Sequence, residues 1–319
     1  MIKATHVFKS YKDHVALENV SLSVQESELF GIAGLNGAGK STLLSVLTGL
    51  IRPDSGTVYY RDVDIFSTNA RSGLRIGFVP QEIALFQDLR VFENLEFWAW
   101  TGTSQTKEQV RDSAMNAAFQ SGLEHVLKKK LSALSGGMKR RVNIAAALAM
   151  NPDVLIMDEP TVGLDVKNRR DIMRFIRALV TQSKSTNICD PVAQSASSNA
   201  TTDPNHSLTV IFTSHQSGEL ETFCDRLLLL HRGKSVYEGS LADVVPAFSR
   251  TPDASAVTGQ GSDYGAIPVN TSPDALKSAY ANNDTEAQAP TIAGLRENDG
   301  IPPAFLGIDD ILYHLDRLL

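Results

Sequence analysis

The sequence is poor in cysteine and has no excess of positive charge. Cys189 and Cys224 are the only cysteines among 319 residues, and they form no CxxC pair, so we expect neither a disulfide framework nor a cysteine zinc site. The 30 Lys and Arg residues are outnumbered by 36 Asp and Glu residues, and the formal net charge of -6 gives no overall attraction to nucleic acid or anionic lipid. These shortages favour a protein of the reducing cytoplasm without a nucleic-acid partner.

Long apolar segments are also absent from the sequence. The nearest candidates, Val142–Met150 and Leu227–Leu230, fall well short of the roughly 18 uncharged residues that a bilayer-spanning helix needs. Lys3, His6 and Lys9 interrupt the first ten residues, which therefore lack the apolar core of a secretory signal. We expect a chain that neither crosses a membrane nor is exported.

What the sequence does contain is a series of short apolar runs. Hydrophobic residues make up 42% of the chain, which is typical of globular proteins, and the length predicts two domains or one large one. Leu29–Ala33 predicts a buried strand, and the leucine and valine spacing in Ser41–Leu50 predicts a helix that follows it. Other expected strands of this α/β fold lie around Val7 and Phe8 and at Ala16–Val24, Arg75–Val79, Asp153–Met157, Leu208–Phe212 and Arg226–Leu230.

A glycine-rich loop joins the Leu29–Ala33 strand to the following helix. Its sequence GLNGAGKS, from Gly34 to Ser41, matches the pattern GxxxxGK[ST]. Glycines let backbone N–H groups close around phosphate oxygens, and the start of the helix adds partial positive charge. Lys40 can then reach the β- and γ-phosphates, and Ser41 can hold Mg²⁺. The alternative is a glycine turn with a solvated lysine, but the order of strand, loop and helix favours a binding site for a nucleoside triphosphate.

Two adjacent carboxylates follow another apolar strand. Asp158 and Glu159 come directly after Val154–Met157, and neighbouring acids at a strand end are costly without a partner. Asp158 is therefore a candidate to support a metal ion, and Glu159 to orient or deprotonate an attacking water. Taken alone, such a pair is also typical of an exposed strand end.

A third motif, LSGGMKRR, occupies Leu134–Arg141. Ser135 offers a hydroxyl, Gly137 an unhindered backbone, and the following helix an N-terminal dipole. With the first two motifs, this segment closely resembles the nucleotide-binding subunit of ABC transporters, in which LSGG caps the γ-phosphate of ATP held by the opposite protomer of a head-to-tail dimer. Met138, where many relatives have glutamine, and the basic residues after it resemble the branch that serves drug, polysaccharide or lipid-linked exporters.

Four further positions match this family in order. Tyr11 corresponds to the aromatic residue that stacks on adenine, and Gln81 to the glutamine that contacts Mg²⁺ and the attacking water. Asp165, in Gly163-Leu164-Asp165, corresponds to the aspartate that reaches across the dimer, and His215 to the histidine that binds the γ-phosphate. The alternatives are a half-exposed tyrosine, a surface glutamine, a helix-capping aspartate and a structural histidine.

The resemblance implies a P-loop NTPase core with a mixed sheet, an antiparallel β subdomain and an α-helical signature subdomain. It implies catalytic roles for Glu159, His215 and Gln81, and Mg²⁺ binding by Ser41, Gln81 and Asp158. The nucleotide-binding residues that it implies are Tyr11, Gly34, Asn36, Gly37, Ala38, Gly39, Lys40, Ser41, Thr42, Ser135, Gly136, Gly137 and Asp165.

The resemblance covers residues 1–245, with the helical subdomain at about 88–150. Residues 183–207 are polar and poor in large apolar side chains, so they predict a solvated insertion in a surface connection. Residues 246–307 have a similar low-complexity composition and predict a flexible tail. In residues 308–319, isoleucine and leucine fall on one helical face, which predicts an amphipathic helix that docks on the core or on a partner.

Two other clusters have two interpretations each. The aromatic segment from Phe92 to Trp100 is explained mostly by core packing, but the family resemblance places a groove for a membrane subunit beside it, so we expect Trp98 or Trp100 to be partly exposed. The basic runs Lys128–Lys130 and Lys139–Arg141 could form a nucleic-acid patch, but a solvated helix face fits the acidic total better.

The leading hypothesis is therefore an ATP- and Mg²⁺-dependent ATPase subunit that powers transport through a separate polytopic permease. We expect a homodimer or a dimer with a paralogous ATPase, held on the cytoplasmic face of the membrane by the permease. The alternative is a soluble ABC ATPase with a regulatory, translation or DNA-related role. Such relatives usually carry two cassettes or long coiled coils, and neither feature occurs in this sequence.

Overall fold

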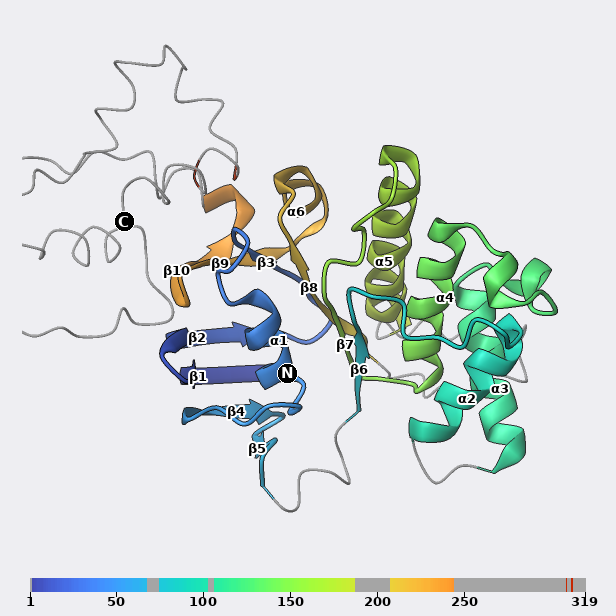
Figure 1. Ribbon diagram of the computed structural model, residues 1–319, viewed down its shortest axis with the longest axis horizontal. Coiled ribbons are helices and arrows are strands. Elements are labelled where there is room, and N and C mark those ends of the chain that lie inside the picture. Colours follow the sequence, from blue (N-terminus) through green and yellow to red (C-terminus); the bar gives the residue numbers. More distant parts are fainter. Residues whose placement is uncertain are drawn as a thin grey trace, which may run out of the picture.

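The computed structural model describes residues 2–67, 75–102, 106–186 and 207–243, together with Ile308 and Ile311. Three parts follow one another across the molecule (Figure 1): a four-stranded antiparallel sheet, a six-stranded central sheet, and a lobe of three helices. The expected α/β architecture with an antiparallel β part and a helical part is therefore confirmed. Within the described ranges, no helix is long and apolar enough to cross a membrane.

The central sheet has the strand order β10-β9-β3-β8-β7-β6, and its five strands from β9 to β6 are parallel. Helices cover both faces, so these strands are nearly continuous apolar runs, and this is why the sequence predicts most of them to within two residues. Their bounds are β3 Leu29–Ala33, β6 Ile76–Val79, β7 Val154–Met157, β8 Thr209–Ser214, β9 Arg226–His231 and the antiparallel β10 Lys234–Ser240.

The smaller sheet has the order β2-β1-β4-β5, with bounds β1 Ile2–Tyr11, β2 His14–Val24, β4 Ser55–Tyr60 and β5 Val63–Asp64. Its apolar face packs on helix α1, Lys40–Leu47, and on one face of the central sheet, in a core that joins Val20, Leu43 and Phe30. Helix α1, which follows the glycine-rich loop, is thereby held between the two sheets.

The opposite face of the central sheet is covered by α5, Val166–Thr186, and α6, Ser217–Phe223. The helical lobe contains α2, Val91–Gly102, α3, Lys107–Gln120, and α4, Gly136–Ala149, and has its own apolar core around Leu95, Leu123 and Val142. LSGG stands at the start of α4.

Two expected boundaries differ from the structure. Helix α1 ends at Leu47 rather than Leu50, because Gly49 adopts a left-handed conformation (φ 74°) and turns the chain away. Leu50 is consequently 67% exposed and is not part of the buried helix face. The polar insertion is shorter than expected, since residues 183–186 belong to α5 and Ser207 is buried before β8. The rest of it, 187–206, lies outside the described residues.

The C-terminal segment contributes two described residues. The 246–307 tail lies outside the described residues, but Ile308 and Ile311 are helical and buried in the same core as α5 and α6. The Ile308 N–H donates to Glu221 Oε1 at 2.9 Å. The sequence allowed this segment to dock either on the core or on a partner. In the structure, Ile308 and Ile311 dock on the core.

Candidate active site

The glycine-rich loop runs from the end of β3 to the start of α1. Gly37 and Gly39 have φ values of 80° and 102°, which favour glycine. A Cβ at Gly39 would lie 2.5 Å from the Ala16 carbonyl oxygen, and one at Gly34 would lie 2.5 Å from that of Leu230. The loop therefore needs glycine both for its conformation and for its close approach to neighbouring strands. Asn36, Gly37 and Ser41 are exposed on its outer side, where a ligand can reach them.

Lys40 folds back over this loop. Its side chain is 7% exposed, and Nζ donates to Gly34 O at 2.7 Å and to Leu35 O at 3.3 Å. Burial lowers the pKa of Lys40, while the carboxylates of Glu159 and Asp158 oppose that shift. The ammonium group is thus held where a phosphate oxygen could take over from the loop carbonyls.

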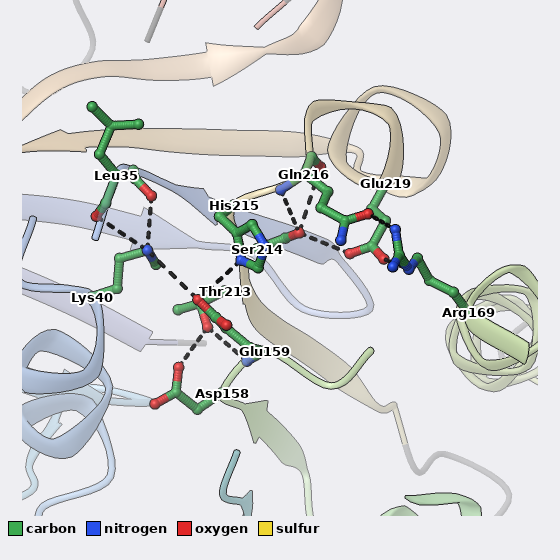
Figure 2. A network of polar contacts seen from close by, with 11 residues as sticks. Leu35, Lys40, Asp158, Glu159, Arg169, Thr213, Ser214, His215, Gln216 and Glu219 are labelled. Carbon is green, nitrogen blue, oxygen red and sulfur yellow. Dashed lines mark hydrogen bonds and ion pairs between the residues drawn. The ribbon is translucent and has the colours of Figure 1, made fainter. Parts of the chain in front are cut away.

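The two carboxylates at the end of β7 are linked to β8 by one hydroxyl (Figure 2). Thr213 Oγ1 donates to Asp158 Oδ1 at 2.7 Å and accepts from the Glu159 N–H at 2.9 Å. Asp158 and Thr213 are both buried, and Glu159 adopts a left-handed backbone conformation (φ 43°) that is uncommon for this residue type. This turn directs the Glu159 carboxylate toward Lys40, and its Oε1 lies 3.8 Å from Nζ.

His215 completes the cluster. Its Nδ1 lies 3.3 Å from Glu159 Oε1, and its side chain is 44% exposed. Lys40, Asp158, Glu159 and His215 follow β3, β7 and β8, so the carboxyl ends of three parallel strands bring them together, as Figure 2 shows. This arrangement places a cation, two acids and an imidazole beside the glycine-rich loop.

Comparison with known proteins identifies the family. The sequence profile described as ABC transporter matches residues 17–162, and a profile of AAA domains from type IV toxin–antitoxin systems matches residues 128–221. The chain is 36% identical over 244 residues to the linearmycin resistance ATP-binding protein LnrL of Bacillus subtilis, which covers 76% of this chain and 70% of that protein. The chain belongs to the ABC transporter ATP-binding family.

Two further comparisons agree with this family membership. The chain is 37% identical over 235 residues to the Nod factor export ATP-binding protein I of Bradyrhizobium diazoefficiens, covering 73% of this chain and 68% of that protein. Among solved structures, a dimeric ATP-binding cassette in a post-hydrolysis state with ADP and Pi matches with a TM-score of 0.61 and 28% identity, covering 76% of this chain and 99% of the other. As an ABC ATP-binding subunit, the chain is an ATPase, and such subunits dimerise and work with membrane permeases.

The ABC signature lies on a different lobe from this cluster. Ser135 caps α4 and its Oγ accepts from the Met138 N–H at 3.4 Å, and Ser135 and Gly136 are exposed. Gly137 packs closely on Asn168, where a Cβ would lie 3.1 Å away. No hydrogen bond or ion pair of the described residues joins the signature to Lys40 or Glu159, and Figure 1 shows α4 and α1 well apart.

The structure also describes the remaining expected site residues, which are Tyr11, Gln81, Thr42 and Asp165. Tyr11 is half-exposed at the end of β1, with Lys9 Nζ 5.7 Å from its ring centroid. Gln81 is exposed just after β6, and Thr42 lies in the first turn of α1. Asp165 accepts from the backbone N–H and the side-chain amide of Asn168 at 2.9 and 2.6 Å, and these bonds lower its pKa. Within this chain Asp165 acts as a helix cap, the alternative that the sequence had left open.

A second polar network beside His215 was not predicted (Figure 2). Ser214 Oγ donates to Glu219 Oε2 at 2.7 Å and accepts from the Gln216 N–H at 3.0 Å. Arg169 of α5 contacts Gln216 Oε1, donates to Leu164 O at 3.1 Å, and places Nε 3.6 Å from Glu219 Oε1. The network ties the loop that holds Asp165 to the segment that holds His215. No local pattern signals it, because Arg169 and Gln216 are 47 positions apart.

The aromatic and basic clusters have different outcomes. Trp100 is 56% exposed, so the expectation that Trp98 or Trp100 is partly exposed is confirmed. Of the two basic runs, Lys128–Lys130 is exposed as expected. The expected solvated face is wrong for Lys139–Arg141, because Arg140 is buried and Arg141 lies over the ring of Phe175, with its guanidinium carbon 5.1 Å from the centroid. Interlobe packing, which the sequence does not reveal, buries part of this basic run.

Proposed function

We propose that this chain drives export through a separate membrane-spanning permease, in a dimer of two copies or of one copy and a paralogue. The separation of the signature motif from the Lys40, Glu159 and His215 cluster carries this proposal. A single chain keeps LSGG and its own phosphate loop on different lobes, so the loop of one chain and the signature of another can enclose one ATP. The names of the two relatives, linearmycin resistance and Nod factor export, favour export over the soluble alternative.

The residues of the cluster suit distinct parts of ATP hydrolysis. The loop N–H groups and Lys40 would bind the β- and γ-phosphates, and His215 would bind the γ-phosphate. Glu159 would orient the attacking water and accept its proton. Tyr11 would stack on the adenine ring, and Ser135, Gly136 and Gly137 would contact the γ-phosphate bound to the partner chain, which Asp165 would also approach.

The same cluster fits Mg²⁺. Ser41, Gln81 and Asp158 supply hydroxyl, amide and carboxylate oxygens, which are the ligands that this cation prefers. Among the described residues no group of three His, Cys, Asp or Glu side chains could hold a metal alone, and this agrees with a Mg²⁺ ion bound mainly by phosphates and water. Bound there, the ion would neutralise charge that develops on the phosphate oxygens.

An exposed aromatic patch on the helical lobe suits the permease. Phe86, Phe97 and Trp100 are 47%, 44% and 56% exposed, and the rings of Phe86 and Phe97 meet edge to face with centroids 4.9 Å apart. Large exposed aromatic side chains gathered in this way typically mark a protein interface. Docking at this patch would place the ATPase on the cytoplasmic face of the membrane as a peripheral subunit.

Mild-detergent purification from native membranes tests this function. The tagged full chain should recover a polytopic membrane protein, identified by mass spectrometry, and the double substitution Phe97→Ser with Trp100→Ser should lose it. Tyr59→Ser on β4, also an exposed aromatic, is the matched control and should retain the partner. Recovery of only soluble proteins by the unsubstituted chain would support the soluble alternative instead.

A further inference from the structure

Arg140 is a buried cation that has no carboxylate partner among the described residues. Its side chain is 4% exposed, and within the described part of the chain no acidic group lies within ion-pair distance of its guanidinium. Burial alone lowers its pKa, with no charged neighbour to oppose the shift. Burying a charge is costly unless hydrogen bonds compensate, so the partners of Arg140 require an explanation.

Those partners are two consecutive backbone carbonyls. Arg140 donates from one terminal nitrogen to Pro80 O at 3.0 Å and from the other to Gln81 O at 2.5 Å. The planar guanidinium presents two donors side by side, which matches two acceptors fixed next to each other. A side chain of the signature helix α4 thus holds the backbone on both sides of the Pro80–Gln81 peptide bond.

The carbonyl just before these two is held by a different lobe. Val79 O accepts from the Asp158 N–H at 2.9 Å, and Val79 pairs with Met157 in the central sheet. The acceptors at Val79 and Pro80 are neighbours in sequence, but the first is bound to the central sheet and the second to the helical lobe. The junction between the lobes therefore falls between Val79 and Pro80.

The far end of the same loop also belongs to the helical lobe. Asn94 of α2 accepts from the Phe86 N–H at 2.9 Å and donates to Phe86 O at 3.1 Å. Further along, the Ser132 N–H donates to Gln87 O and the Leu131 N–H to Leu89 O. With Arg140 at one end and Asn94 at the other, the loop from Pro80 to Phe86 is held at both ends by helices of one lobe.

We propose that Arg140 is a positioning residue that fixes the backbone of Gln81 against the signature helix and thereby sets where Gln81 stands relative to Asp158 and Glu159. This inference rests on the proposed function in one respect, because it assumes that Gln81 acts on the nucleotide. Both hydrogen-bond acceptors of Arg140 are backbone carbonyls. Its effect on hydrolysis passes through the backbone of Pro80 and Gln81.

The test compares Arg140→Met with Arg141→Met in the full-length purified chain. Arg141 is the matched control, because it also donates to a backbone carbonyl, that of Ser121, one position further along the same helix. Glu82 is exposed beside Gln81, so a glutamate-specific protease can cleave after it. The rate of this cleavage reports release of the loop and does not depend on ATP hydrolysis. The fragments are followed by intact mass.

We expect Arg140→Met to raise the rate of cleavage after Glu82 roughly fivefold or more, because the clamp at one loop end is lost. It should lower kcat about tenfold and change KM for ATP little, since the phosphate loop is untouched. Arg140→Lys should change the cleavage rate and kcat less than Arg140→Met does, because a lysine can still donate to one carbonyl. Arg141→Met should leave cleavage and kcat within about twofold of the unsubstituted chain.

Combination with Gln81→Ala decides whether the effect passes through Gln81. If it does, the double variant with Arg140→Met should have the kcat of Gln81→Ala alone, whereas independent roles would multiply the two losses. Multiplied losses, unchanged kcat in Arg140→Met, or a fall in kcat without faster cleavage would each overturn the proposal. Should Arg140→Met not fold, Arg140→Lys provides the same comparisons. Failure of the proposed function is distinct, since it would appear as loss of permease recovery with the cleavage result unchanged.

Discussion

Thr213 Oγ1 lies 2.7 Å from Asp158 Oδ1, and both residues are buried where β7 ends beside β8. The same hydroxyl accepts from the Glu159 N–H, so one side chain fixes the positions of two adjacent acids. A hydroxyl is needed for this, because it can donate and accept at once. The acidic pair is therefore oriented by a residue 55 positions away in the chain.

Replacing Thr213 with valine should remove this support while keeping the shape of the side chain. We expect kcat to fall by about 10- to 100-fold, the range seen when partners of metal ligands are lost. The free energy of unfolding should fall by about 1–3 kcal/mol, because a buried carboxylate oxygen loses its donor. Steady-state hydrolysis and urea unfolding measure the two effects. Thr213→Ser, which keeps the hydroxyl, should recover most of the activity.

The substitution Glu159→Gln tests the proposed water-activating role. It keeps the size of the side chain but removes its ability to accept a proton, so hydrolysis should fall on the order of 100-fold or more. Binding of ATP, measured with a fluorescent analogue, should remain, because Lys40 and the phosphate loop are intact. Glu108→Gln, at an exposed position of α3, should hydrolyse ATP normally. Normal hydrolysis by Glu159→Gln would contradict the assignment.

Arg169 and Glu219 should behave as one unit. Arg169 donates to Leu164 O and contacts Gln216, and its ion-pair partner Glu219 accepts from Ser214, next to His215. Arg169→Met and Glu219→Gln should each lower kcat several-fold. The double variant should lose little more than either single variant, with a coupling of about 0.5 kcal/mol or more. Kinetics of the four proteins measure this coupling, and strictly additive losses would show that the two residues act separately.

Docking of the C-terminal segment should contribute to stability. Ile308 is fully buried against the core, so Ile308→Ala should lower the free energy of unfolding by about 2–5 kcal/mol. Leu50→Ala removes a similar volume from an exposed position and should change it by no more than about 0.5 kcal/mol. Urea titration with the full-length chain gives both values. Equal effects of the two substitutions would show that the segment does not dock in solution.

Asp54 should make part of the stability dependent on pH. Hydrogen bonds from the Lys9 ammonium and from Ser10 lower the pKa of Asp54 to about 2, against an ordinary value of 3.8 in the unfolded chain. Because the pKa is lower in the folded state, ionised Asp54 stabilises the fold at pH values above its pKa in the unfolded chain. This contribution is lost as the pH falls toward 2. The difference in unfolding free energy between the native chain and Asp54→Asn should therefore be largest above pH 4 and shrink below it. A constant difference would contradict this.

Contiguous features were readable from the sequence because their chemistry is local. The loop from Gly34 to Ser41 needs glycines at fixed positions, and the buried parallel strands need continuous apolar runs, so both appear directly in the order of residues. The helix that follows the LSGG segment was predicted for a similar reason, whereas the partial exposure of Trp98 or Trp100 was expected from the family resemblance. The helix end at Gly49 was missed, because Leu50 continues the apolar spacing although the backbone has already turned.

Other features were decided only when distant segments met. The sequence by itself determined the glycine-rich loop from Gly34 to Ser41 and membership of the family. It also determined that Asp158, Glu159 and His215 come shortly after apolar runs that form strands. The tertiary structure decided that Asp165 caps its own helix, that Thr213 orients Asp158, and that Arg140 is buried against Pro80 and Gln81. The physical reason is that a polar side chain takes its role from whichever donors or acceptors the fold places beside it, and those partners come from other lobes and strands.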